Sequence, residues 1–478
     1  MVAFHFQVLV LALLPLIEAS ETILGAFIFS RHGDRSTKSY PPTHLTDLGY
    51  QQIYQSGGFY RNRYITNGST QIYGISTDLV KLSQLEVQTA VDDVLQSCAT
   101  GFLQGLYPPV GATLGSQTLA NGTSVEAPFN GYQIVPVNAL ASAVDNSGDA
   151  TWLQGASGCV NAVAASNNYF FSSDYKTLSS STASFYQSIL PVINNTFTAA
   201  TAIYKNAYAI WDLVQVSMIH NATIQSSDLL TPANVLQLET LANHHEFSLA
   251  YNASNSLVAI AGSVLASQIV EYLNMTLTTT APKLSLQLGE YAAFLSFFGL
   301  ASLPSVSDNF TGIVNFASSM TFELVTNATV TGTAYPPVDQ VSVRFLFANG
   351  SAADTPLMPY PLFGQSSLEL PWTTFMTEMN KISVSGQADW CTACGNTSTG
   401  CTSTSTSVVT VTATPGATDS SRDNGISTAV GGVIGAMVTL AVILGIEALV
   451  LLLVGLRIVE KRSASPVVVT EPQGGLKA

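Results

Sequence analysis

The sequence predicts an α/β fold, with a mostly parallel β-sheet flanked by helices and a large helical insertion. Near the N-terminus, residues 23–30 are apolar without alternation, as in a parallel strand buried on both faces. Strand-like segments return at 283–288, 320–326 and 341–350, whereas helical periodicity dominates the middle, about 120–276. Strand–helix alternation at both ends of a helical middle is typical of an α/β core that carries an insertion.

Two helices are predicted between the first strand and the insertion. Residues 45–65 have amphipathic periodicity with an internal glycine break, and residues 82–104 also have a helical pattern. The prolines at 108 and 109 end the second helix, because the residue before a proline avoids the helical region.

Composition narrows the functional classes. Only 10% of the 478 residues are charged and the formal net charge is −14, so the chain lacks the basic face that nucleic-acid binding requires. At 47% hydrophobic residues, the chain can bury a large core. We therefore expect one large or two ordinary domains and no nucleic-acid partner.

Both ends carry targeting patterns. A short apolar run followed by small residues predicts a signal peptide at 1–19. The apolar run 428–456 is long enough to cross a bilayer, and basic residues follow it at once. These features predict a single-pass type I membrane protein with an extracellular or luminal ectodomain, a lipid bilayer as partner, and a cytoplasmic tail at 457–478.

The ectodomain is expected at 20–395, and a Ser/Thr-rich stalk at 396–427 separates it from the membrane. Asn-x-Ser/Thr sequences agree with surface glycans on an external domain. These sequences begin at Asn67, Asn121, Asn194, Asn221, Asn252, Asn274, Asn309, Asn327, Asn349 and Asn396.

The chain has five cysteines, and an oxidising compartment favours disulfides between them. The odd number leaves at least one thiol free or paired between chains. Cys391 and Cys394 have the CxxC spacing of zinc or redox sites, but no second CxxC or His pair lies near. A structural clasp at the end of the domain is the favoured interpretation, and the pairing stays open.

Residues 31–35, RHGDR, follow directly after the first predicted strand, where open α/β sheets bind ligands. Two guanidinium groups near one point bind a tetrahedral oxyanion, and a histidine between them can attack phosphorus. Gly33 would allow the backbone to approach a ligand closely. The alternative is a surface ion-pair cluster in which Asp34 pairs with its neighbours.

The motif occurs in a series that resembles a known family. RHGDR after a strand, LTDLG at 45–49, STD at 76–78 and FLQGLYPP at 102–109 together resemble the histidine acid phosphatases, the acid phosphatase and phytase branch of the histidine phosphatase superfamily. The stalked, membrane-tethered layout is most similar to fungal, membrane-anchored members. The resemblance implies a phosphoglycerate-mutase-like core, a phosphomonoester substrate, a phosphohistidine intermediate, and no metal or other cofactor.

The resemblance assigns roles to particular residues. His32 matches the nucleophile, and Arg31 and Arg35 match two phosphate-binding arginines. Three residues after STD, the family has a third arginine and this chain has Lys81, which keeps the charge but loses the bidentate fork.

The largest departure follows the strand at 283–288. The family has a His-Asp pair there, and this chain has Gly289 and Glu290. Glu290 is the candidate general acid, since a glutamic acid with a raised pKa can protonate a leaving group. The alternative is a helix N-terminal acid stabilised by the helix dipole.

Other charged residues are expected to be structural. Arg61 and Arg63 lie at the end of a predicted helix, Arg344 is an outward charge on a strand, and the pair His244–His245 lacks the second half of a zinc-protease motif. The functional expectation is a weak phosphomonoesterase at the cell surface or in the secretory pathway. The alternatives are a phosphatase fold that binds phosphorylated ligands without turnover, and a structural glycoprotein.

Overall fold

The computed structural model describes residues 21–140 without 67, residues 158–397 without 333, and residue 401. The predicted signal peptide, membrane span and cytoplasmic tail, and nearly all of the predicted stalk, lie outside these residues. Within the described part, the helical stretch Ser256–Thr279 has the length and composition to cross a membrane. Its most apolar window is 67% buried inside the protein, as in the core helix of a soluble domain.

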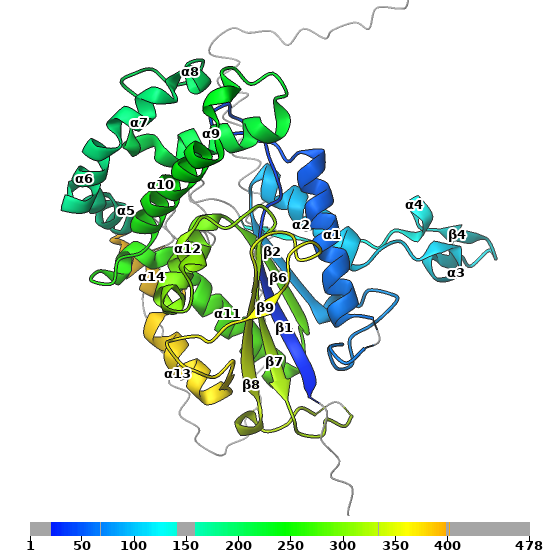
Figure 1. The fold of residues 1–478 in the computed structure, drawn as a ribbon. Helices are drawn as coiled ribbons and strands as arrows, with labels where there is room; N and C mark the ends of the chain where they lie inside the picture. The colour runs from blue at the N-terminus through cyan, green and yellow to red at the C-terminus, as the bar shows by residue number, and fades with distance from the viewer. Residues whose placement is uncertain (1–20, 67, 141–157, 333, 398–400, 402–478) are drawn as a thin grey trace, which may run out of the picture. The chain divides into compact units, whose positions relative to one another are not determined.

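The predicted α/β class is confirmed by a central sheet with helices on both faces (Figure 1). The strands lie in the order β10-β8-β7-β1-β6-β2-β5, and β9 pairs with β8. Their bounds are β1 Thr22–Arg31, β2 Leu85–Ala90, β5 Asn138–Leu140, β6 Leu284–Gly289, β7 Ser319–Thr326, β8 Ser342–Ala348, β9 Met358–Pro359 and β10 Glu369–Pro371.

The sheet is less parallel than the sequence predicted. Strands β1, β6, β2 and β5 are parallel, whereas β7 is antiparallel to β1 and to β8, and β8 is antiparallel to β9 and β10. Among its described residues, the connection from β7 to β8, residues 327–341, contains no α-helix. Parallel neighbours are usually joined by a crossover helix, so a connection without one suits an antiparallel pair.

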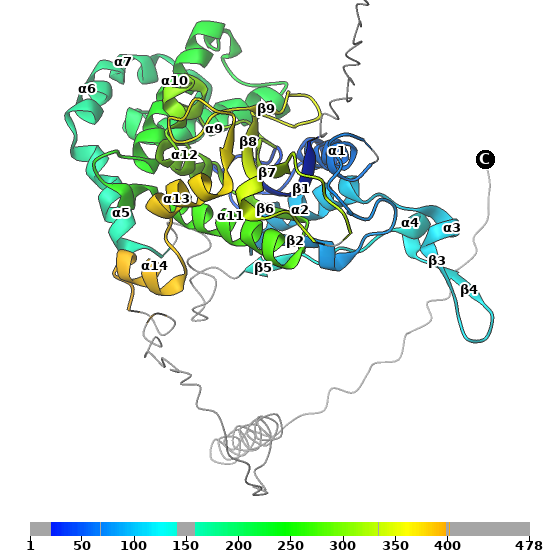
Figure 2. The same cartoon turned by 90° about the horizontal axis from the view of Figure 1, so that it is seen from below.

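Helices cover both faces of the sheet (Figures 1 and 2). On one face lie α1 Asp47–Tyr64 and α2 Asp93–Leu106, and on the other lie α11 Ile260–Thr279, α12 Tyr291–Leu300 and α13 Trp372–Ile382. In β1, Ala26 and Ile28 pack against α1 and α2, whereas Phe27 and Phe29 pack on the opposite face against α11, α12 and α13. Burial on both faces explains why this strand is an unbroken apolar run.

A helical region lies between β5 and β6 in the sequence and has a core of its own (Figure 1). Its α-helices are α5 Val160–Asn167, α6 Ser173–Ser181, α7 Ala183–Ser188, α8 Leu190–Ile193, α9 Ala207–His220 and α10 Pro232–Ala250. Residues 116–140 are not predominantly helical. They contain the hairpin of β3 Ser116–Thr118 and β4 Ser124–Glu126, the short helix α4 Pro128–Gly131, and β5; another short helix, α3 Gly111–Gly115, precedes the hairpin.

Two predictions near the N-terminus were wrong. The stretch 82–104 is not one helix, because residues 85–90 form β2, whose alternating burial reflects a period of two. Helix α1 runs without a break through Gly57 and Gly58. A Cβ at Gly57 would overlap the backbone oxygen of Phe102, so this glycine lets α1 pack closely against α2.

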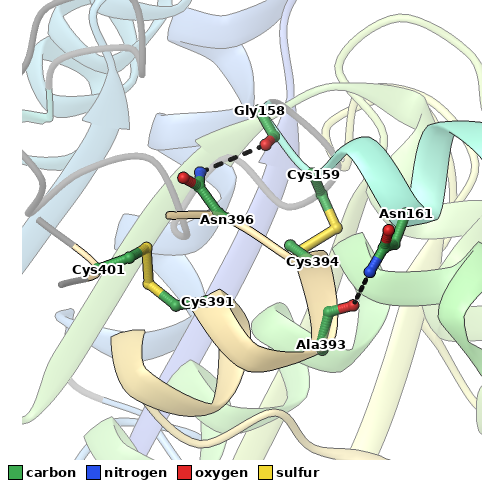
Figure 3. Close-up of a disulfide and its surroundings, with 8 residues drawn as sticks. All are labelled: Gly158, Cys159, Asn161, Cys391, Ala393, Cys394, Asn396 and Cys401. Carbon is green, nitrogen blue, oxygen red and sulfur yellow. Dashed lines mark hydrogen bonds between the residues drawn. A yellow bond between two sulfur atoms is a disulfide. The ribbon is translucent and has the colours of Figure 1, made fainter. Parts of the chain in front are cut away.

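One disulfide joins the helical region to the end of the ectodomain, and a second lies within that end (Figure 3). Cys159, just before α5, pairs with Cys394, and Cys391 pairs with Cys401; both CxxC cysteines lie in α14 Gln387–Cys394. The two cysteines thus form a structural clasp and do not pair with each other. Cys98 is a buried free thiol.

The predicted glycosylation sites differ in accessibility. Asn349 and Asn396 are half-buried, the first accepting a hydrogen bond from the backbone of Asn315 and the second donating one to Gly158. Asn67 lies outside the described residues. The exposed sites are Asn121, Asn194, Asn221, Asn252, Asn274, Asn309 and Asn327.

Candidate active site

The site is built where β1 and β6 end. The two strands are parallel and pair Arg31 with Gly289, so their carboxyl ends lie at the same edge of the sheet. His32 follows the first strand and Glu290 follows the second. The register therefore brings together two candidate residues that are far apart in the sequence.

His32 is buried and held in one orientation. Its Nδ1 donates a hydrogen bond to the backbone oxygen of Gly33 at 2.8 Å, so the proton of the neutral ring lies on Nδ1. Nε2 has no hydrogen-bond partner among the described residues, and the nearest carboxylate oxygen of Glu290 lies 3.8 Å away. Burial lowers the pKa of His32 below its usual value, and the two arginines lower it further. The ring therefore presents a free lone pair on Nε2, as a nucleophile requires.

Phe316 brings the two arginines together around this histidine. Its ring centroid lies 5.6 Å from that of His32, 4.7 Å from the guanidinium carbon of Arg31 and 5.8 Å from that of Arg35. Arg31 also lies 5.3 Å from the ring of Tyr291 and donates to the backbone oxygen of Val314. Aromatic rings and a carbonyl thus hold the Arg31 guanidinium in place.

Arg35 is engaged by side chains from α9. Its guanidinium forms an ion pair of 2.9 Å with Asp212 and donates to the hydroxyl of Tyr208 at 3.1 Å. Asp212 also accepts from the Thr37 hydroxyl and the Lys38 backbone nitrogen, which orders the loop after the motif. An anion at the site must therefore share Arg35 with Asp212.

Sequence analysis missed Asp212, although a signal was present. It is the only charged residue in the apolar segment AYAIWDLVQV, and it is 3% exposed. Acidic side chains are almost never fully buried unless they are paired. A lone acid in a helix of this kind therefore indicates a cationic partner.

Glu290 precedes α12 but does not cap it, because its side chain accepts no capping hydrogen bond. One carboxylate oxygen lies 3.3 Å from the Lys38 ammonium and faces His32. Burial alone would raise the pKa of Glu290, but the positive charges of Lys38 and Arg31 lower it. Glu290 is thus ionised when no ligand is bound, and it needs an anion nearby before it can serve as a general acid.

Asp34 and Gly33 have structural roles. Asp34 is fully buried and accepts hydrogen bonds from Thr46 and from His220, which lies 2.5 Å away at the end of α9. A Cβ at Gly33 would overlap the backbone of Gly49 in α1. The glycine therefore permits close packing against α1, whereas the sequence had suggested a close approach to a ligand.

Comparison with known proteins assigns the family. The sequence profile of the family described as histidine phosphatase superfamily, branch 2, matches residues 39–347. The chain belongs to this family. A search of curated protein sequences gives no match.

Solved phytases have the same fold as this histidine phosphatase. The phytase of Klebsiella sp. ASR1 superposes with a TM-score of 0.52 at 12% identity, over 76% of this chain and 95% of the phytase. The Citrobacter braakii phytase gives 0.51 at 13% identity, over 78% and 99%. The apo form of the Hafnia alvei phytase gives 0.50 at 15% identity, over 79% and 98%. At these identities the likeness shows the fold alone.

The structure does not place Lys81 in the site of this histidine phosphatase, contrary to the prediction. Lys81 is exposed and precedes β2, so it lies at the amino-terminal end of the parallel strands, near Lys283. The site edge of β2 is followed instead by residues 91–94, which include Asp92 and Asp93 and no cation. Among the described residues, the segment after β2 therefore supplies no cation to the site, and the third cation near Glu290 is Lys38.

The other charged residues considered earlier are structural. Arg63 pairs with the buried Glu323, and Arg61 donates to two backbone oxygens. Arg344 is not a simple outward charge, because it pairs with Glu323, Glu21 and Glu369. His245 is buried and forms a hydrogen bond with the carboxylate of Glu246. Among the described residues, no group of three or more His, Cys, Asp or Glu is placed to hold a metal ion.

Proposed function

We propose that this protein is a weak phosphomonoesterase that forms a phosphohistidine at His32. The observation that carries the proposal is the state of the buried imidazole: Nδ1 donates to Gly33, and Nε2 is unpartnered within the described residues. Arg31 and Arg35 flank it and supply donors suited to phosphate oxygens. Membership of the histidine phosphatase superfamily supports the same chemistry.

The reaction proceeds in two steps. Nε2 of His32 attacks phosphorus, the bond from phosphorus to the ester oxygen breaks, and the alcohol leaves with a proton from Glu290. Water then attacks the phosphohistidine, Glu290 takes a proton from the water, and phosphate and neutral His32 are released. Glu290 is ionised in the free protein, so it gains its proton when the negative ester binds and raises its pKa.

The same geometry supports the proposal that the activity is weak. Arg35 is shared with Asp212, and no cation follows β2 at the site edge. Fewer donors at the transferring phosphoryl group mean less stabilisation of the transition state.

A second candidate function is ligand binding without turnover. It is favoured by the two ion pairs that already use the site's charges, Arg35 with Asp212 and Lys38 with Glu290. In that case a phosphorylated ligand or phosphate would compete with Asp212 for Arg35, and His32 would stay unmodified.

We also propose a cellular location for the protein. The apolar run 428–456, the basic residues after it and the exposed Asn-x-Ser/Thr sites support a single-pass type I glycoprotein of the membrane-anchored type found in fungi. Its ectodomain, 20–395, would face the cell exterior or the lumen of the secretory pathway.

Trapping of the intermediate tests the catalytic proposal. The full-length chain is incubated with a ³²P-labelled aryl phosphate and quenched in alkali, which preserves phosphohistidine. We expect label on the wild type and on His44→Ala, whose exposed side chain lies outside the site, and none on His32→Ala. Release of phosphate that persists in His32→Ala would contradict the proposal. A wild type that binds vanadate but neither labels nor turns over would favour the binding function.

A further inference from the structure

A small chamber that is partly open to solvent lies beside the catalytic edge, behind Glu290. It has a volume of about 160 Å³ and is lined by residues of β1, β2, β5, β6, α2, α11 and α12. Phe29, Leu265 and Ala293 contribute apolar wall, and Glu290 is the only ionisable residue among its described lining. The same Glu290 carboxylate lies 3.8 Å from Nε2 of His32, so the chamber adjoins the reacting centre.

The chamber wall contains an unusual polar group, formed by Gln268 on α11 and Gln287 on β6. Nε2 of Gln287 donates to Oε1 of Gln268 at 2.9 Å. The remaining amide atoms, Nε2 of Gln268 and Oε1 of Gln287, have no hydrogen-bond partner within the described part of the chain, and neither has the hydroxyl of Thr89. These side chains are 1%, 8% and 2% exposed, respectively.

Unpaired buried polar groups are rare, and each one needs an explanation. In this chamber, the two free amide atoms are a donor on Gln268 and an acceptor on Gln287, and both lie beside the apolar part of the chamber wall. A neutral ligand with one hydroxyl group, which can both donate and accept, would satisfy them, whereas an anionic group would lose its hydration without gaining an opposite charge. The segment after β2, whose Ala90 lines the chamber, adds Asp92 and Asp93 and so further disfavours anions.

The size of the chamber limits the ligand to about one ring. An apolar protein cavity of about 150 Å³ holds one benzene molecule. A chamber with about 160 Å³ of accessible space therefore suits a phenyl group or another compact ring better than a ring that carries several phosphates.

We propose that this chamber binds the alcohol half of the phosphoester, and that this half is one compact neutral ring with a single polar substituent. The inference rests on the proposed phosphatase function and adds its substrate class. With the ring in the chamber, the ester oxygen lies next to Glu290, which protonates it. The protein should thus act on monophosphates of neutral cyclic or aromatic alcohols in preference to inositol hexakisphosphate.

Kinetics with phosphate esters of graded size test the chamber. In the wild type, we expect phenyl phosphate to have a KM about tenfold or more below that of methyl phosphate, as burial of a ring predicts. Ala261→Phe places a ring in the chamber and should remove this difference by raising the KM of phenyl phosphate alone. Ala233→Phe, at an exposed position in α10, is the matched control and should behave as wild type.

A second variant tests the same proposal independently, in case Ala261→Phe does not fold. Gln268→Leu removes the free donor and leaves the chamber nearly the same size. We expect the wild type to prefer 4-hydroxyphenyl phosphate over 4-methylphenyl phosphate, and Gln268→Leu should abolish this preference. The melting temperature of the variant shows whether it is folded.

Binding of phenol separates failure of the chamber from failure of the catalytic proposal. Phenol binding, measured by calorimetry on the full-length chain, should survive in His32→Ala and be lost in Ala261→Phe. That result would support the chamber even if no ester is hydrolysed. The inference is overturned if Ala261→Phe changes neither phenol binding nor the KM of phenyl phosphate, or if inositol hexakisphosphate is the better substrate.

Discussion

The charge states of His32 and Glu290 depend on each other and on the cations around them. Burial lowers the pKa of His32, so its imidazole stays neutral, and able to attack, at a lower pH than an exposed histidine would. Neighbouring cations lower the pKa of Glu290, which favours its ionised carboxylate. A bound phosphate raises the pKa of Glu290, because its negative charge offsets those cations and favours the protonated carboxyl.

Substitution of Glu290 tests its role as proton donor. Glu290→Gln should slow hydrolysis of alkyl phosphates by on the order of 10² to 10⁴ and aryl phosphates far less, since an aryl oxide leaves without a proton. In the wild type, phosphate binding near pH 5 should be accompanied by proton uptake, measured by calorimetry in buffers of different ionisation enthalpy. This uptake should disappear in Glu290→Gln. An unchanged alkyl-to-aryl ratio would show that Glu290 is not the donor.

At the scale of elements, the register of β1 on β6 places the nucleophile and the acid at the same edge of the sheet. The same register limits the size of the side chain that position 289 can accommodate. A Cβ at Gly289 would overlap the ring of Phe29 on the neighbouring strand. The histidine that the family has at this position cannot be restored unless Phe29 is made smaller. The choice of residue at position 289 is therefore coupled to the packing between β1 and β6.

Stability measurements test this coupling. Gly289→Ala should lower the free energy of unfolding by about 1–3 kcal/mol, as overpacking of a core does. Gly58→Ala is the matched control: it lies inside α1 with no atom near its Cβ, and it should raise stability by about 0.4–1 kcal/mol. Adding Phe29→Leu to Gly289→Ala should cost less than the sum of the single changes in urea denaturation. Strict additivity would mean that the two residues do not clash.

At the scale of the whole molecule, the accessibility of the glycosylation sites tests the proposed secretory location. Mass spectrometry after enzymatic release of N-glycans in ¹⁸O water should find occupancy among the exposed sites, Asn121 and Asn252 included. Asn349 should be unmodified, because it is half-buried and accepts hydrogen bonds from Asn315 and Ser318. Complete absence of glycans from protein expressed in its native cells would contradict the secretory location.

The sequence alone determined those features that depend on neighbours in the chain or on a general rule of topology. An unbroken apolar run predicted the buried strand β1, and RHGDR directly after it predicted His32 and Arg31 at the edge of the sheet. The family resemblance, which places an acid after the strand at 283–288, assigned Glu290 to the same site. The α/β class followed from the same periodicities.

Only the tertiary structure decided the features that depend on contacts distant in sequence. Periodicity did not show that 85–90 would form a strand between β6 and β5, and this strand displaced Lys81 to the opposite end of the sheet. The partners of Arg35 come from α9, nearly two hundred residues away in the same chain. Cysteine spacing could not choose among disulfide pairings, which depend on where α5 and α14 meet. In each case local sequence sets what a segment can form, and long-range packing selects which side chains meet.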